Sequence, residues 1–503
     1  MCCVCCEWRQ VVTAAKKVHP EWRSTVLGPA SNGSESLELL RTNHLNWADT
    51  RFAPDLVLLS AASKDPSPWH SGGYWEVAIA AIEEATLLPP TCKIVGMLTM
   101  NAVLRTSEDE PDEESEERDS SAVTLSISVA HLPDSTMEMA EFDRKDLRRC
   151  QRGVELDNPF TAIEDIPSFM LFGVNDQSAS QLVPVVEEWY PGAAVVGAVS
   201  PLIDRCIPLV TYSGTGNRQD RKPRKNRGAK QSSQRASSCR PRPQGEISFP
   251  STMLLRLHGN VGIRSFSSSG YYPITPVIRC ERASVVDELS QVVTYDLVSK
   301  LNRDASEELA LHLIMNLLEP SERFAIEQEG RGLNIFSCTN SEPLEHLLAC
   351  CNSNKIKQSQ STSMPIDRLE FVFWLQNGLM SLPGLCWQQG AYGILAAHHP
   401  TRTSHALAKA LQSTQTDLSS RSEREFGAFV VAGALNEVED PVYAKEISQL
   451  CIDVFKELQI GGCIVSSSIG PVAFPGGIQP PVDRNTTQVQ THTTCGAVFY
   501  TKA

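Results

Sequence analysis

Four cysteines among the first six residues are the part of the chain whose side chains could most directly carry chemistry. Cys2, Cys3, Cys5 and Cys6 would supply thiolates, which bind zinc tetrahedrally. A pentapeptide cannot wrap one ion without strain, so we predict no metal here. Neighbouring cysteines near an N-terminus also suit palmitoylation, but no second membrane signal accompanies them. A third interpretation, which we favour, is that they are small apolar residues of a helix.

No catalytic motif accompanies these thiols elsewhere in the chain. The sequence has no Gly-x-Ser-x-Gly turn, no phosphate-binding Gly-rich loop, no dinucleotide-binding glycine triplet and no His-Glu-x-x-His pair. The other cysteines lack a second Cys-x-x-Cys or a histidine pair at zinc spacing. We therefore expect a protein that is not an enzyme and that holds no cofactor or metal.

The elements that would position any site alternate between short apolar runs and helical patterns. Helices are expected at 74–87, 179–189 and 441–458, where apolar residues recur at helical spacing. Strands are expected at 55–61, 92–98, 122–130, 168–173, 193–198, 426–434 and 461–465. The order of strand, helix and glycine-containing strand occurs three times. This order predicts a mixed α+β fold in which helices cover the sheets.

The net charge of −14 is unevenly distributed, and three polar stretches interrupt the pattern of elements. Residues 106–121 are strongly acidic, 214–247 are basic, and 352–364 are polar. Each has too few large apolar residues to offset the entropy of ordering, so we expect disordered insertions. The basic insertion could act in nuclear import through Arg221, Lys222, Arg224, Lys225 and Arg227, although a solvated loop is the simpler interpretation.

Composition also bears on the partners and the compartment. The basic residues are not interleaved with aromatic ones, so we do not expect a nucleic-acid partner. No apolar run approaches the roughly 20 residues that cross a bilayer, so we expect no membrane. The sixteen cysteines are dilute and irregularly spaced, as in reduced intracellular proteins. We therefore expect a protein of the cytoplasm and, if the basic insertion is an import signal, of the nucleus.

The order of these elements resembles that of the FIST domain (F-box and intracellular signal transduction). The resemblance is carried by PDLVLLSAAS, CKIVGMLTMNAV, SFMLFGVND and AAVVGAVSP in the first half, and by GYYPITPVIRC at the link. EFGAFVVAGALNE, IGGCIVSSSIGP and QVQTHTTCGAVFYT carry it in the second half. It implies an N-terminal FIST half at 25–271 and a C-terminal FIST half at 272–503, each with sheets covered by helices.

The N-terminal segment resembles the last helix of an F-box, which carries a Val-Cys-x-x-Trp-Arg pattern. The matching residues are Val4, Cys5, Trp8 and Arg9, and Val12 continues the apolar face. Because such a helix needs partner helices, residues 1–24 are expected to be the C-terminal remnant of an F-box, and the chain looks truncated at its front. The resemblance implies binding to the adaptor of a cullin–RING ubiquitin ligase.

The C-terminal half departs from the family where a ligand site would be expected. The family's Cys-x-Gly-Arg-Gly turn is replaced by Val431–Asn436, and its Gly-Glu by Ser467-Ser468. The missing arginine and glutamate put the gripping of a zwitterion in doubt. The candidate ligand or substrate surface comprises Gly433, Asn436, Ser466, Ser467, Ser468, Gly470, Thr491, His492 and Thr493. Its hydroxyls could line a neutral polar pocket, or they could only satisfy strand-end backbone groups, which we favour.

Two functions follow from the resemblance. The first is a non-catalytic substrate receptor of an SCF-type cullin–RING ligase, which would select a protein substrate for ubiquitin-dependent degradation. The second is a free-standing FIST sensor of a small molecule, or a signalling scaffold. The first function requires adaptor binding through the F-box-like helix, whereas the second requires a ligand that stabilises the protein.

Overall fold

The structure is a computed structural model. The F-box-like residues and the basic cluster at 221–227 lie outside the residues that it describes. The described residues are 19–43, 53–63, 67–70, 72–86, 88–89, 91–102, 122–201, 206–214, 245–287, 290–295, 320, 333–352, 367–370, 379–383, 390–398, 400–421, 423–433, 441–455, 458–473, 487–490 and 493–502.

The first unit of the core is a sheet with two helices on one face. Its elements are β1 (Glu21–Ala30), α2 (Gly33–Thr42), β2 (Leu56–Ser63), the short helix η1 (Ser67–Trp69), α4 (Gly73–Thr86), β3 (Lys93–Thr99) and β5 (Val123–His131). The strands β2 and β3 run parallel, whereas β5 lies antiparallel between β1 and β2. A parallel pair needs a crossover, and α4 supplies it.

The second and third units repeat this order of elements. The second comprises β6 (Ser135–Phe142), α5 (Arg144–Gln151), β7 (Ser168–Gly173), α6 (Asp176–Trp189), β8 (Ala194–Val199) and β11 (Thr252–Gly259). The third comprises β12 (Val261–Ser269), α11 (Pro400–Ser420), β20 (Arg424–Gly433), α12 (Pro441–Val454), β21 (Ile460–Val465) and β24 (Thr493–Thr501). Again β7 and β8 are parallel, as are β20 and β21.

The three units exchange strands in a cycle. The strand that follows β3 is β4 (Asn101–Ala102), and it pairs with β21 of the third unit. The strand that follows β21 is β22 (Ser467–Pro471), and it pairs with β8 of the second unit. The strand that follows β8 is β9 (Leu209–Ser213), and it pairs with β3 of the first unit. Each sheet therefore takes a strand from a neighbouring unit, which ties the three units into one body.

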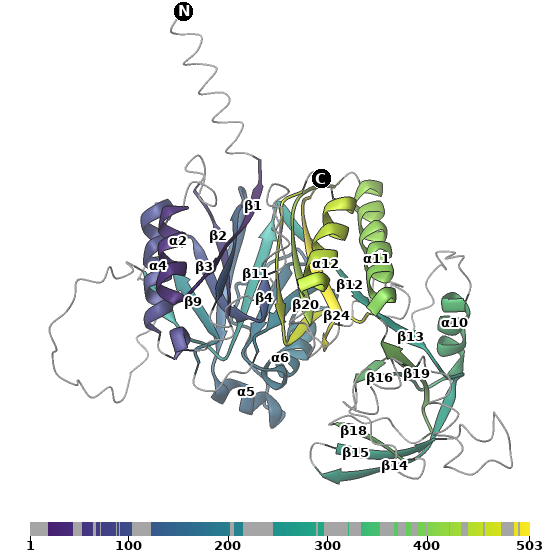
Figure 1. The fold of residues 1–503 in the computed structure, drawn as a ribbon. Coiled ribbons are helices and arrows are strands. Elements are labelled where there is room, and N and C mark those ends of the chain that lie inside the picture. Colours follow the sequence, from purple (N-terminus) through teal and green to yellow (C-terminus); the bar gives the residue numbers. More distant parts are fainter. Residues whose placement is uncertain are drawn as a thin grey trace, which may run out of the picture.

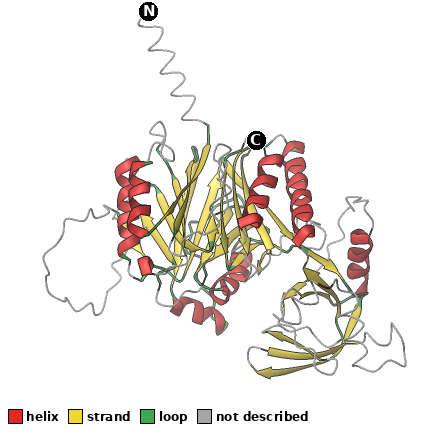
Figure 2. Ribbon diagram, in the orientation of Figure 1, coloured by secondary structure: helices red, strands yellow, loops and turns green. Residues whose placement is uncertain are grey.

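The inner faces of the three sheets share one hydrophobic core. It includes Met97 of the first unit, Phe172 of the second and Phe429 of the third. Each outer face forms its own core with a helix pair: α2 and α4, α5 and α6, or α11 and α12. Figures 1 and 2 show this arrangement, with the strands in the middle and the helices around them. Sheets with two apolar faces explain the nearly continuous apolar runs of the sequence.

A fourth sheet is inserted in the third unit, between β12 and α11, and it lies at the lower right of Figure 1. Its strands are β13 (Tyr271–Pro273), β14 (Ile278–Asp287), β15 (Ser290–Tyr295), β16 (Leu333–Cys338), β17 (Asp367–Glu370), β18 (Leu379–Pro383) and β19 (Tyr392–His398). The helix α10 (Ser341–Asn352) packs on it through Leu344 and Leu347. Two short edge strands, β10 (Glu246–Ser248) and β23 (Thr487–Gln490), complete the first and second sheets.

The predicted mixed α+β fold and its strand-helix-strand order are confirmed. At the front, Glu21–Ser24 were expected in the F-box-like helix but begin β1, because Trp22 is buried in the shared core. Glu246 and Ile247, expected in the basic insertion, belong to β10, where Ile247 pairs with Tyr212. The predicted halves meet just after β12, which pairs with β24, so the structural units follow another division. No described helix is long and apolar enough to cross a membrane.

Candidate functional site

The three parallel strand pairs end at one place, where the exchanged strands cross between units. We call this place the strand-crossing junction and define it by residues 98–100, 199–201 and 464–467. The backbone carbonyls of Leu98, Val199 and Ile464 occupy equivalent positions, because each accepts a hydrogen bond from the segment that leaves the end of another unit's strand. Ligands of α/β proteins commonly bind at the carboxyl ends of parallel strands, so this end of the core is the place to look for a site.

Hydrogen bonds close the junction into a ring, in which each unit donates to the next. The backbone N–H of Met100 donates to Ile464 O (2.7 Å), and that of Ser466 donates to Val199 O (3.2 Å). The equivalent residue of the second unit is Pro201, which has no N–H to donate. Instead, the hydroxyl of Ser200 donates to Leu98 O at 2.9 Å. The serine hydroxyl therefore replaces the missing backbone donor.

Six of the nine predicted site residues are described, and they lie together beside this junction: Gly433, Ser466, Ser467, Ser468, Gly470 and Thr493. The hydroxyl of Ser468 donates to Thr493 O at 2.7 Å. A Cβ on Gly433 would lie 2.9 Å from Gln490 O, so the backbones meet here too closely for a side chain. The other three, Asn436, Thr491 and His492, lie outside the described residues.

The serine hydroxyls at the junction serve two different roles. Ser466 donates to the carbonyls of Val199 (2.9 Å) and Ser200 (3.2 Å), and Ser468 donates to strand-end carbonyls in the same way. For these two, satisfying the backbone is the role that the structure gives. Ser467 differs, because its buried hydroxyl has no hydrogen-bond partner among the described residues.

Asp176, an exposed residue at the start of α6 near Ser467, is a candidate that the sequence analysis missed. Desolvation by the surrounding protein raises the pKa of its carboxyl above the usual value, and the Ser467 hydroxyl acts in the opposite direction. The signal that could have found it is its place three residues after β7, beside the crossing strand. Asn175 before it caps α6 by accepting a hydrogen bond from Ser178 N at 2.8 Å. The capped helix start thus fixes where the Asp176 carboxylate lies.

Several buried hydroxyls near the junction have no hydrogen-bond partner among the described residues. Thr99 at the end of β3 is 3% exposed, and its Oγ1 is one of them. Ser467 at the start of β22 and Ser268 and Ser269 at the end of β12 are others. Burying a hydroxyl without a partner costs roughly 1–3 kcal/mol, so such groups call for a ligand or water. The described junction can offer neutral donors and acceptors, with one carboxylate beside them.

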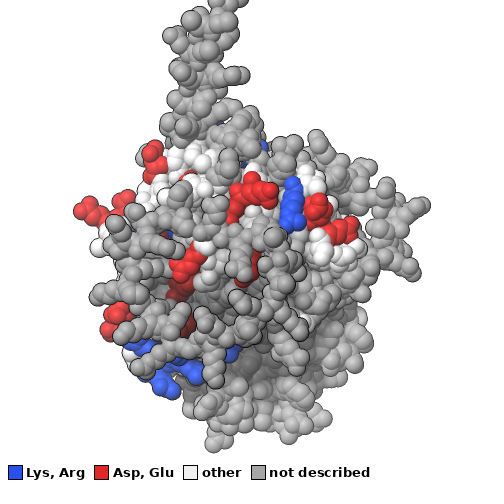
Figure 3. Space-filling view, turned by 90° about the vertical axis from the view of Figure 1, so that its left-hand side faces the viewer, with Lys and Arg blue, Asp and Glu red and all other residues white. Residues whose placement is uncertain are grey.

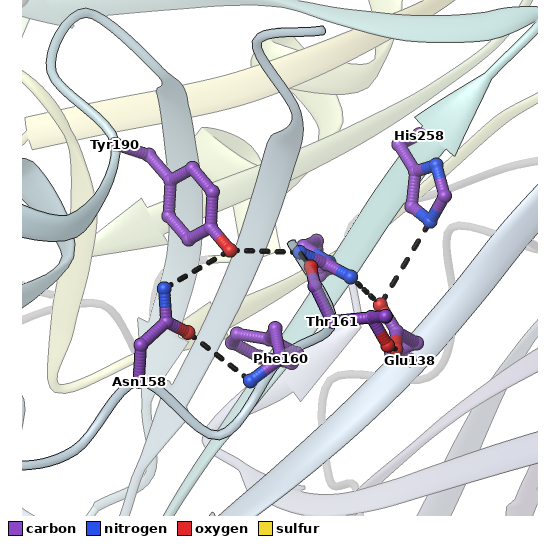
Figure 4. Close-up of polar contacts among 7 residues, drawn as sticks. Glu138, Asn158, Phe160, Thr161, Tyr190 and His258 are labelled. Carbon is purple, nitrogen blue, oxygen red and sulfur yellow. Dashed lines mark hydrogen bonds and ion pairs between the residues drawn. The ribbon is translucent and has the colours of Figure 1, made fainter. Parts of the chain in front are cut away.

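A second buried polar cluster surrounds Arg256 on the outer face of the second sheet (Figure 4). The Arg256 side chain is 0% exposed and pairs with Glu138. Its guanidinium donates to Thr161 O and to the Tyr190 hydroxyl, both at 2.7 Å. It also lies over the Phe160 ring, 4.8 Å from the centroid. These contacts hold the loop before β7 and the end of α6 against the sheet.

The Arg256 cluster is a structural clamp, not a second ligand site. All its strong contacts are internal, and Asn158 continues them by donating to the Tyr190 hydroxyl at 3.1 Å. The strand pairings place Val129 of the first unit and Val498 of the third at the positions equivalent to Arg256. The first and third units therefore have the same arrangement of strands with an apolar residue at this position.

No protein-family model and no curated protein matches the chain. The geometry of the junction is therefore the main guide to the function.

Proposed function

We propose that the chain is a non-catalytic recognition protein of the sensor or scaffold kind, which binds a small neutral polar molecule at the strand-crossing junction. The observation that supports this most is the buried Thr99 hydroxyl, which has no partner among the described residues although Thr99 lies in the junction itself. A ligand that exchanges hydrogen bonds with it would remove the cost of burying it. The neighbouring hydroxyls and Asp176 supply further contacts to such a ligand.

A thermal-shift screen of polyols, sugars and primary amides tests this proposal. A compound at 100 times its dissociation constant should stabilise the protein by about 2.7 kcal/mol. Thr99→Val keeps the side-chain shape but removes the hydroxyl. We expect this variant to be as stable as the wild type without ligand, because no bond is lost, and to lose most of the ligand-induced shift.

Thr414→Val is the matched control, because Thr414 is a buried threonine of α11 whose hydroxyl donates within its own helix at 2.9 Å. This variant should keep the full ligand-induced shift. If no compound stabilises the wild type, or if Thr99→Val and Thr414→Val respond alike, the junction is not the binding site.

The resemblance to FIST proteins favours a more specific role, that of substrate receptor in an SCF-type ubiquitin ligase. This role rests on the Val4, Cys5, Trp8 and Arg9 pattern. If it is correct, the purified full chain should bind the ligase adaptor, and Trp8→Ala should weaken that binding at least tenfold because it removes the largest apolar side chain of the helix. A chain that does not bind the adaptor but is stabilised by a junction ligand would be a free-standing sensor.

A further inference from the structure

The helix α5 of the second unit presents five cations to solvent. Arg144, Lys145, Arg148, Arg149 and the C-cap residue Arg152 are all exposed. Figure 3 shows blue side chains gathered at the lower left, at the height of α5 in Figure 1. This concentration stands out because the whole chain carries a net charge of −14.

The cations of α5 are not engaged in the fold. Within the described part of the chain, none of the five forms an ion pair, whereas Arg23, Arg41, Arg256, Arg264 and Arg421 each pair with a carboxylate. The acidic residues next to them, Asp143 and Asp146, form the capping box at the start of the helix. The positive charge therefore remains available to a partner.

The fold does not require a basic helix at this position. The equivalent helix of the first unit, α2, begins with Glu35 in its first turn and has Arg41 in its last. Arg41 pairs with Glu38 of the same helix. The helix α5 packs on the core through the single buried residue Leu147, and its cations contribute nothing to that contact. Their presence calls for an explanation outside the fold.

We propose that α5 is a docking surface for an acidic, extended segment of a partner protein. Arg144, Arg148 and Arg152 recur every four residues and form one stripe, with about 6 Å between neighbouring side chains. In an extended segment, every second side chain lies on the same side, about 6.6 Å apart. Asp or Glu at alternate positions would therefore match the stripe. Val154, which is 44% exposed just beyond the helix, adds an apolar contact.

Other polyanions fit this surface less well. Stable binding to an anionic membrane usually needs an apolar face as well as cations, and the apolar residue of α5 is buried. Binding of single-stranded nucleic acid needs aromatic rings among the cations, and α5 has none. An acidic segment would thus be one class of partner for the proposed recognition protein. Binding of such a segment is independent of a junction ligand, because the two surfaces are probed with different molecules.

Fluorescence anisotropy of a labelled peptide of six Asp-Ser repeats, titrated with the full chain at low salt, tests the inference. We expect the wild type to bind this peptide at least tenfold more tightly than the Asn-Ser analogue. The triple variant R144Q/R148Q/R152Q should bind about tenfold more weakly than the wild type, because three exposed charge pairs are lost. Glutamine favours the helix nearly as well as arginine, so the fold should be retained.

The control variant R41Q/R421Q/R424Q removes three surface cations elsewhere, of which Arg41 is partly exposed and the other two are exposed, and it should keep the wild-type affinity. If both triple variants lose the same affinity for the peptide, binding depends only on net charge, and the proposal is overturned. A wild type that does not distinguish the two peptides would also overturn it. So would α5-dependent binding to phosphatidylserine vesicles or to an oligonucleotide without binding to the peptide. If the peptide binds as expected while no junction ligand is found, only the junction proposal fails.

Discussion

Glu138→Leu should destabilise the folded protein by about 3–5 kcal/mol, because it leaves the guanidinium of Arg256 buried without its counter-charge. Glu138 is the carboxylate that pairs with Arg256, whose side chain is 0% exposed. The remaining contacts, with the Thr161 carbonyl and the Tyr190 hydroxyl, are neutral and cannot balance the charge. Urea denaturation followed by circular dichroism measures the loss.

The double variant Glu138→Leu/Arg256→Met is the decisive comparison. It removes both charges and leaves an apolar strand position like those of Val129 and Val498 in the other two units. We expect most of the lost stability to return, because replacing a buried ion pair by apolar residues is often neutral. A double variant as unstable as Glu138→Leu would mean that the hydrogen bonds of Arg256, and not charge balance, stabilise this region.

The pH dependence of stability gives a second readout of the same cluster. Burial lowers the pKa of His258 below its usual value of 6.5, and the nearby charge of Arg256 lowers it further. As the pH falls through that usual value, the unfolded chain takes up the proton first, so the folded protein loses stability. Arg256→Met removes one cause of the pKa shift. The difference in melting temperature between pH 7.5 and pH 5.5 should therefore be smaller in this variant than in the wild type.

The elements that the sequence predicts best are strands that are buried by apolar residues on both faces of the sheet. The strand Ser168–Gly173 was predicted with its observed bounds, because its residues are buried on both faces of the sheet. The chain's first strand, Glu21–Ala30, was missed altogether, since Glu21–Ser24 were assigned to a helix and no strand was expected after them. Trp22 fits a helical face as well as a strand, and only its contacts with the third sheet decide between them.

The exchange of strands and the Arg256 clamp could not be predicted from local patterns. The exchanged strand β4 has two residues, too few for any periodicity. Arg256 lies 118 residues from Glu138 in sequence, so nothing near it indicates a partner. The serines at 466–468 were expected near a strand end, but their contacts with the second unit depend on how three distant strand ends meet.

Trp22→Ala should be the other strongly destabilising substitution, by about 3–5 kcal/mol. Trp22 is 2% exposed, and its ring stacks on Phe499, with the ring centroids 4.5 Å apart. Because Trp22 belongs to the first sheet and Phe499 to the third, the substitution opens a cavity where two units meet. Trp189→Ala is the matched control. Trp189 lies at the end of α6 and is only partly buried, so its replacement should destabilise the protein much less.

Gly427 allows a sharper test of this contact. A Cβ built on Gly427 would lie 2.3 Å from the Cβ of Trp22, so a methyl group there cannot be accommodated without movement of the backbone or of the tryptophan. We expect Gly427→Ala to cost about 1–3 kcal/mol in the wild type, as overpacking does. A Trp22→Gly background removes both the Cβ and the indole that crowd this position, so most of that cost should disappear. Double-mutant coupling of this kind requires that the two residues touch. If Gly427→Ala costs the same in both backgrounds, the first and third sheets do not meet at Trp22, and the shared core must be arranged differently.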